Sequence, residues 1–160
     1  CISYEWEPCD DMKAVEIYTS RSTRYIKHHG EDLHSIMAGI SEPKGGVHIA
    51  FCPPVTHQEL MQYNDLTASE YNRAVARLID GKILSAYRLY PNNYIAHDLR
   101  SGTTRFADRY TPEQKVEFED YMRLLDEYKE LEINMLKSIF LGIYANPVDS
   151  FLKVLEPRHG

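Results

Sequence analysis

GGVHIAFCPPV, at residues 45–55, is the stretch that most clearly favours a β-strand and so decides between an all-helical and a mixed fold. Its alternating apolar residues are Val47, Ile49 and Phe51, and two adjacent prolines end the run. A period of two is typical of a strand, and proline ends a strand because it lacks a backbone donor. Since the opposite face is only mildly polar, we expect a strand that is covered on both sides.

A second strand is predicted at residues 2–6 (ISYEW), where apolar and polar residues also alternate. Two short helices separate the strands. The first follows Asp10 or Asp11 as N-cap, and the second has an apolar face made of Leu33, Ile36, Met37 and Ile40. A helical crossover ordinarily joins parallel strands, so the sequence predicts a parallel pair.

The second half of the chain carries the strongest helix signals. Thr67 and Glu70 form a capping box in TASE, and Thr111 begins a second one in TPEQ. We expect the last long helix to stop at Asn146-Pro147, because proline cannot donate the helical hydrogen bond. The predicted fold class is therefore α/β and helix-rich. A small sheet remnant of a larger α/β core occupies residues 1–65, and a helical C-terminal extension at residues 66–160 packs on it as one compact unit.

The charge balance excludes some classes of partner. The 160 residues include 18 basic and 24 acidic side chains, a net charge of −6, so we expect no binding to nucleic acid. Three cysteines without a CxxC motif suit a reducing, cytoplasmic compartment. Cys1 could be a nucleophile, a lipid-anchor site or an interior residue of a longer protein, and we expect the last of these.

The known catalytic and metal motifs are absent. HHGEDLH groups His28, His29, Glu31, Asp32 and His34, but this spacing does not aim two histidines at one ion, and solvated loop residues are the favoured interpretation. The sequence has no GxSxG, GxGxxG or GxxxxGK[ST] motif. We therefore predict no metal site and no cofactor.

A cluster of tyrosines and asparagines gives the only candidate ligand wall. Two interpretations remain open: packing in the core with satisfied hydroxyls, or a hydrogen-bonding wall beside a ligand or a membrane. The candidate substrate-binding residues are Tyr87, Tyr90, Asn92, Asn93 and Tyr94.

Four stretches together resemble a known family. ISYEWEPCDDMKA, GEDLHSIMAGI, GGVHIAFCPPV and YPNNYIAHDLRSGTTRF are similar to the C-terminal portion of bacterial glycerolipid acyltransferases, the 1-acylglycerol-3-phosphate acyltransferase-like family. The resemblance implies a parent protein of phospholipid biosynthesis. Its partners would be acyl-CoA or acyl carrier protein as acyl donor and a lysophospholipid as acceptor. It also implies peripheral contact with the inner face of the membrane.

The family's catalytic motifs are missing from this chain. No His is followed by Asp five positions later, and no Glu-Gly-Thr-Arg block occurs. Cys52 stands where the family usually has a small Gly. No catalytic residue can therefore be assigned, and we expect the chain alone to be inactive. The alternative from another class is a non-enzymatic α/β module whose tyrosine-rich helices bind a protein partner. In either case an exposed sheet edge would favour a homodimer.

Overall fold

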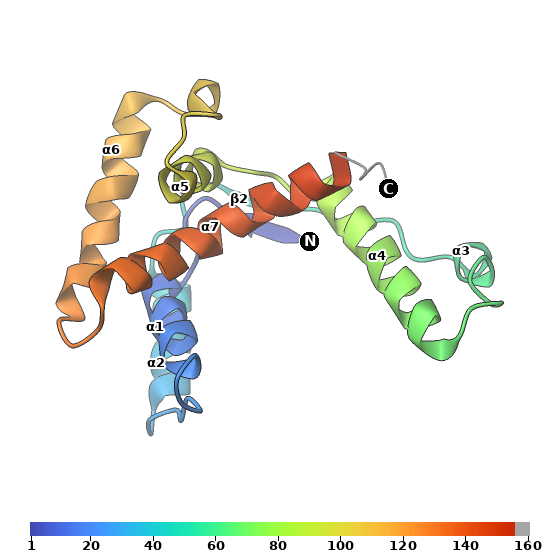
Figure 1. The fold of residues 1–160 in the computed structure, drawn as a ribbon, viewed down its shortest axis with the longest axis horizontal. Helices are drawn as coiled ribbons and strands as arrows, with labels where there is room; N and C mark the ends of the chain where they lie inside the picture. The colour runs from blue at the N-terminus through green and yellow to red at the C-terminus, as the bar shows by residue number, and fades with distance from the viewer. Residues whose placement is uncertain (156–160) are drawn as a thin grey trace. The chain divides into compact units, whose positions relative to one another are not determined.

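The computed structural model describes residues 1–155, and helices dominate it (Figure 1). The helices and strands, in chain order, are β1 (Ile2–Tyr4), α1 (Asp10–Ser20), α2 (Glu31–Ser41), β2 (Val47–Ile49), α3 (His57–Met61), α4 (Ala68–Ala86), α5 (Pro91–Ser101), the 3-10 turn η1 (Ala107–Arg109), α6 (Pro112–Tyr121), the 3-10 turn η2 (Met122–Glu127) and α7 (Ile133–Leu155).

The chain divides into two compact units, each made of segments that are distant in sequence. The core unit comprises Tyr4–Val47 and Leu89–Asp149. The small unit comprises Cys1–Ser3, His48–Arg88 and the described residues from Ser150 onward. The boundary that the sequence predicted between residues 65 and 66 lies inside the small unit.

The hydrophobic core belongs to the core unit. It collects apolar side chains from α1, α5, α6, η2 and α7. The buried members of the cluster are Ala14, Ile95, Ala96, Phe118, Leu125, Leu136, Ile139, Phe140, Leu141, Tyr144 and Ala145. By contrast, none of the buried apolar side chains within residues 1–155 belongs to α3 or α4. Within the described chain, no helix combines the length and the apolar character needed to cross a membrane.

The two predicted capping boxes are confirmed. The Thr111 amide donates to Gln114 Oε1 at 2.9 Å, and the Gln114 amide donates back to Thr111 Oγ1 at 3.2 Å. At the start of α4, the Thr67 amide donates to the Glu70 carboxylate at 3.1 Å, and the Thr67 hydroxyl donates to the same oxygen at 2.7 Å. These bonds satisfy backbone donors that a helix start leaves without intrahelical partners, which explains why both helices begin where the sequence predicts.

The expected stop at Pro147 is wrong, because α7 runs through it. Proline removes one hydrogen bond from a helix interior. Tyr144 and Ala145, which precede Pro147, and Val148, which follows it, are buried. Breaking the helix there would expose this apolar surface, so packing outweighs the missing bond.

The predicted parallel sheet is also wrong, and with it the α/β class. The two strands form a two-stranded antiparallel sheet. In the core unit the Glu5 amide donates to the Gly46 carbonyl at 2.9 Å. In the small unit the Ala50 amide donates to the Cys1 carbonyl at 3.0 Å. The partner number falls as the residue number rises, which defines antiparallel pairing.

The two helices that connect the strands explain why the pairing is antiparallel and not parallel. The chain between the strands holds α1 and α2, and each helix covers about the same length. One helix carries the chain away from the strand and the second brings it back to the same end, so it re-enters beside the residue it left. A crossover to a parallel strand needs the chain to cross to the opposite end of the sheet.

The prediction that the second strand is covered on both sides is wrong too, since Phe51 is 98% exposed.

Candidate functional site

The site begins at the first turn of α1 in the core unit. The sequence predicts Asp10 or Asp11 as the N-cap, but Cys9 occupies that position with a positive φ of 55°. Asp10 is instead the first helical residue and is 1% exposed. The Glu42 carboxylate accepts a hydrogen bond from the Cys9 amide at 3.1 Å, which holds this uncommon backbone conformation in place.

Tyrosine hydroxyls donate hydrogen bonds to the two aspartates, and no ion pair to either of them forms within residues 1–155. Tyr144 donates a short hydrogen bond to Asp10 Oδ2, and Tyr121 donates to Asp10 Oδ1 at 3.1 Å. Tyr128 donates to Asp11 Oδ2 at 2.7 Å. The first turn of α1 is thereby tied to α6, to the segment after η2 and to α7. These bonds fix the ring of Tyr121, which forms part of the neighbouring cavity.

Burial controls the titration of this cluster. Desolvation raises the pKa of Asp10 from 3.8 to about 6, and the two tyrosine hydroxyls oppose that rise only in part. Desolvation and the nearby Asp10 charge raise the pKa of Tyr121 well above its usual range. Desolvation, followed by the Glu42 charge, also raises the pKa of the Cys9 thiol. A protonated thiol is a weak nucleophile, so Cys9 does not suit covalent catalysis.

A cavity of about 430 Å³ opens beside this cluster. Its lining combines two aromatic rings, three carboxylates and two apolar side chains: Trp6, Asp11, Glu42, Pro43, Glu117, Tyr121 and Leu124. The rings of Trp6 and Tyr121 lie 4.5 Å apart between centroids, tilted by 55°. Phe118 stacks on Trp6, with 5.9 Å between the ring centroids, and this contact restrains the indole. We call this cavity the acidic aromatic pocket.

The three carboxylates differ in how fully they are already bonded. Asp11 accepts from Tyr128, and Glu42 accepts from the Cys9 amide. No hydrogen bond or ion pair engages the exposed Glu117 within residues 1–155. In the same part of the chain, no group of three His, Cys, Asp or Glu residues is close enough to hold a metal ion. The pocket therefore offers negative charge spread over its walls.

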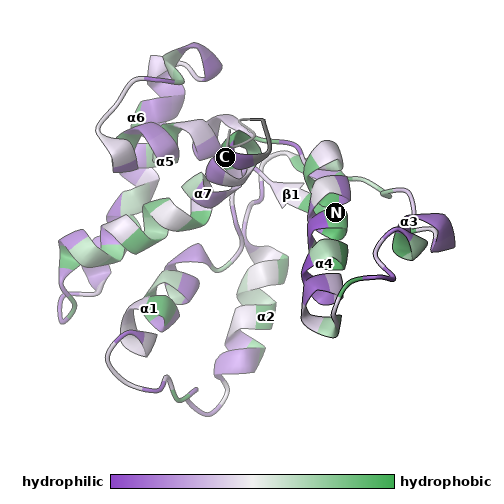
Figure 2. Cartoon of the chain, turned by 45° about the vertical axis from the view of Figure 1, so that its right-hand side comes forward, coloured by the Kyte–Doolittle hydropathy of each residue, from purple (hydrophilic) through white to green (hydrophobic). Residues whose placement is uncertain are grey.

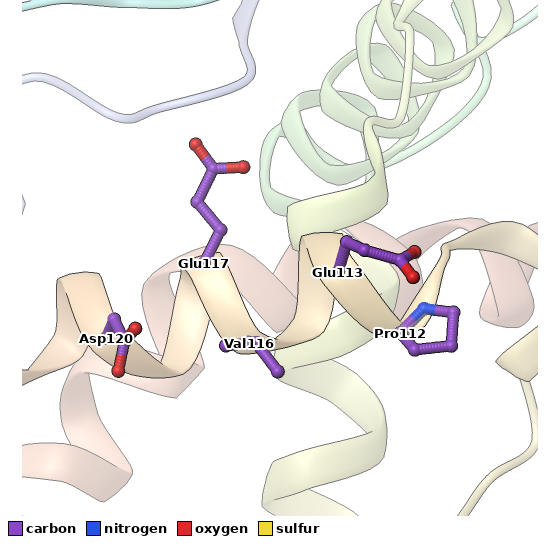
Figure 3. Close-up of a pocket in the computed structure, with 5 residues that line it drawn as sticks. All are labelled: Pro112, Glu113, Val116, Glu117 and Asp120. Atoms are coloured by element: carbon purple, nitrogen blue, oxygen red, sulfur yellow. The ribbon is translucent and has the colours of Figure 1, made fainter.

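Glu117 also borders a shallow depression of about 530 Å³ on the outer side of α6. Figure 3 shows that its lining comes from this one helix, with the Glu117 carboxylate pointing to one side and Val116 to the other. One helix cannot enclose a ligand, so we do not take this depression as a site.

The tyrosine and asparagine residues that the sequence singles out belong to two different units. Tyr87 follows α4 in the small unit, whereas the other four lie in the core unit. Asn92 donates to the Glu5 carbonyl at 2.7 Å, and Asn93 donates to the Tyr144 carbonyl at 2.9 Å. Tyr90 is buried, and its amide donates to Asn93 Oδ1 at 2.7 Å. These bonds hold the start of α5, and a ligand-binding role for Tyr94 and its neighbours stays a prediction.

Sequence reasoning did not find the pocket residues. Tyr121 lies 111 positions from Asp10, and Tyr144 lies 134 positions from it. The pairing of acidic residues at a helix start with tyrosines on later helices leaves no local pattern in the sequence. The one available signal is that the only tryptophan of the chain stands at the end of a predicted strand, close to a pair of aspartates.

No protein-family model matches this chain, and no curated protein and no solved structure matches it either.

Proposed function

We propose that this chain is a protein-interaction module that captures a basic side chain of a partner protein in the acidic aromatic pocket. The observation that carries the proposal is the composition of that pocket, in which three carboxylates share the lining with the adjacent, tilted rings of Trp6 and Tyr121. The proposal develops the non-enzymatic alternative that the sequence leaves open. It places the binding surface at the acidic aromatic pocket and not at the tyrosine-rich helices that the sequence singled out.

The chemistry of the pocket selects an organic cation. A guanidinium or ammonium group is attracted to the face of an indole or phenol ring, and nearby carboxylates add direct ion pairing. Carboxylates that are spread over the walls suit a flat, extended cation better than a compact metal ion. A volume of about 430 Å³ is ample for one arginine or lysine side chain.

Helix α2 directly precedes two of the pocket residues in the sequence, and it carries an exposed apolar surface. Leu33, Ile36, Met37 and Ile40 form a stripe along one face, and each is more than half exposed. In Figure 2, where hydrophobic residues are green, α2 carries both green and purple stretches. The helix contacts Cys9 through a different face, where Cys9 Sγ donates to the Ser35 carbonyl at 3.1 Å. Glu42 and Pro43 of the pocket come directly after the end of α2.

We assign the α2 stripe to the same partner, which is a protein segment with an apolar face and one basic residue. Charge complementarity supports this choice of occupant, because the pocket is acidic and the whole chain carries a net charge of −6. Opposite charge speeds the encounter of two proteins and fixes their register, while apolar contact supplies much of the affinity. An exposed apolar stripe of this kind is typical of an interaction surface.

The only tryptophan of the chain lines the pocket, so its fluorescence reports on binding. We expect Nα-acetyl-arginine amide to change Trp6 emission saturably. The isosteric but neutral Nα-acetyl-citrulline amide should leave it unchanged. Glu117→Gln should weaken arginine-amide binding by about 2- to 5-fold, the range for a partly exposed ion pair. Glu16→Gln removes the same charge elsewhere on the surface and should have no effect. Equal responses to both amides, or to both variants, would contradict the proposal.

A longer probe tests the α2 stripe separately. An amphipathic helical peptide that carries one arginine should bind more tightly than the amide alone. Met37→Glu should remove that gain and leave arginine-amide binding intact. If light scattering instead shows a dimer that Met37→Glu dissociates, a second copy of the chain covers the stripe, and the assignment to another protein is wrong.

The acyltransferase hypothesis stays a prediction. The parallel crossover that it expected is replaced by antiparallel pairing, and the family's catalytic pair is not in this sequence. The same holds for the cytoplasmic location with peripheral membrane contact, and for a homodimer through the sheet edge. Acyl transfer from an acyl thioester to lysophosphatidate by this chain alone would contradict both its expected inactivity and the binding function proposed above.

A further inference from the structure

A second cavity of the core unit has the opposite charge. It measures about 290 Å³ and lies where the end of α1 and the end of α5 meet the middle of α7. Its lining includes two arginines, a serine, a glycine and two isoleucines: Arg21, Arg100, Ser138, Gly142, Ile139 and Ile143. No acidic side chain lines it, although acidic residues outnumber basic ones in the chain as a whole. We call it the arginine cavity.

Arg100 is held in a fixed orientation. Its Nη1 donates to Asn146 Oδ1 at 3.1 Å, and its Nη2 makes a short ion pair with Asp149. The second oxygen of Asp149 lies 3.5 Å from Nε2 of His97. The Asp149 carboxylate is thus shared between two neighbours. It orients the Arg100 guanidinium without being part of the cavity wall.

Arg21 supplies a charge that no acidic side chain pairs with in the part of the chain that the structure describes. Its side chain is exposed, and no ion pair engages it within the described chain. Arg21 follows the last residue of α1, where the partial negative charge of the helix end favours a cation. This explains why the position is tolerated without an acidic partner. The cavity therefore has a net positive charge.

From these contacts we propose that the arginine cavity binds a phosphate group. Guanidinium groups match the geometry of phosphate oxygens and bind them by charge-assisted hydrogen bonds. Arg21 at the end of α1, Arg100 on α5 and Ser138 on α7 all line the cavity, so its donors come from three different elements. A tetrahedral oxyanion can accept from all of them, whereas a planar carboxylate presents only two oxygens. The apolar floor formed by Ile139 and Ile143 strengthens each of these attractions.

Gly142 lines the arginine cavity without a side chain of its own. It lies in the interior of α7, where glycine is unfavourable, so its presence there calls for a structural reason. A Cβ atom built at this position would lie 3.7 Å from Nη1 of Arg100, which is an ordinary contact distance. Gly142→Ala would therefore occupy space beside the guanidinium without forcing the backbone to move.

The test is a titration with inorganic phosphate at constant ionic strength, followed by backbone amide NMR signals. We expect saturable shifts centred on Arg21, Ser138 and Gly142. Arg21→Gln should weaken binding by at least about tenfold, the loss expected for a charge-assisted hydrogen bond. Arg24→Gln removes the same charge from the loop that follows α1, outside the cavity, and should change binding by less than about twofold.

Gly142→Ala separates binding from folding. We expect it to abolish phosphate binding while the thermal midpoint stays equal or rises, because alanine favours the helix. Glu117→Gln should leave phosphate binding unchanged, which makes this result independent of the acidic aromatic pocket. Equal losses in Arg21→Gln and Arg24→Gln would overturn the proposal, and so would acetate binding as tight as that of phosphate. Vesicles of phosphatidylcholine with phosphatidic acid distinguish the source: cosedimentation that Arg21→Gln removes assigns a lipid phosphate, and no cosedimentation assigns a soluble one.

Discussion

Replacing Phe118 with alanine is expected to lower the free energy of unfolding by about 3–5 kcal/mol. Phe118 is 0% exposed, and three aromatic rings surround it. Its centroid lies 5.9 Å from that of Trp6, 6.2 Å from that of Phe140 and 5.2 Å from that of Tyr144. Large rings cannot collapse into the space that the substitution leaves, so both burial and packing are lost. Urea unfolding followed by far-ultraviolet circular dichroism measures the change.

Val116→Ala is the matched control on the same helix. Val116 is 55% exposed, so shortening it should change the free energy of unfolding by no more than about 0.5 kcal/mol. A loss below about 1 kcal/mol in Phe118→Ala would contradict the central position that the structure gives to this ring.

Asp10 is expected to make the protein less stable as the pH rises from about 4 to about 6. Burial raises the pKa of this carboxyl from 3.8 to about 6 in the folded state, so the folded protein holds the proton more tightly than the unfolded chain does. The contribution of Asp10 is therefore greatest below pH 4 and falls as the pH passes through the folded pKa. The difference corresponds to roughly 3 kcal/mol at pH 7.

Asp10→Asn isolates this contribution from every other titrating group. The free energy of unfolding of the variant minus that of the wild type should rise by roughly 2–3 kcal/mol between pH 4 and pH 7. Urea unfolding of both proteins at several pH values gives this difference directly. A difference that stays constant over the range would mean that Asp10 is not desolvated. Asn at this position still offers an oxygen to Tyr144, so the variant should fold.

The sequence predicts helix starts well because the interactions that set them are local. The Thr111–Gln114 and Thr67–Glu70 pairs are three residues apart, so they are visible in a short window. The end of α7 is different. Pro147 is a local stop signal, yet the tertiary burial of Tyr144 and Val148 overrides it. Only the packing partners reveal that outcome.

Neither the direction of the strands nor the candidate sites could be predicted from the sequence, because both depend on tertiary contacts. The alternation at Val47 and Ile49 indicates a strand but carries no information on which way its partner runs. The stripe on α2 looks like a core-facing surface, because hydrophobic spacing is the same for a face that packs internally and a face that awaits a partner. Both pockets depend on contacts that span most of the chain.

Because tyrosine hydroxyls hold several carboxylates of the core unit, the stability of this unit should depend only weakly on ionic strength. Asp10 and Asp11 are held by neutral phenols, and Tyr110 likewise donates to Asp98 at 3.0 Å. Dissolved salt screens attraction between full charges but barely affects a hydrogen bond from a neutral group. The core unit should therefore keep its fold in concentrated salt, while ligand capture at the acidic aromatic pocket and the arginine cavity weakens. Binding can thus be switched off by salt without unfolding the protein.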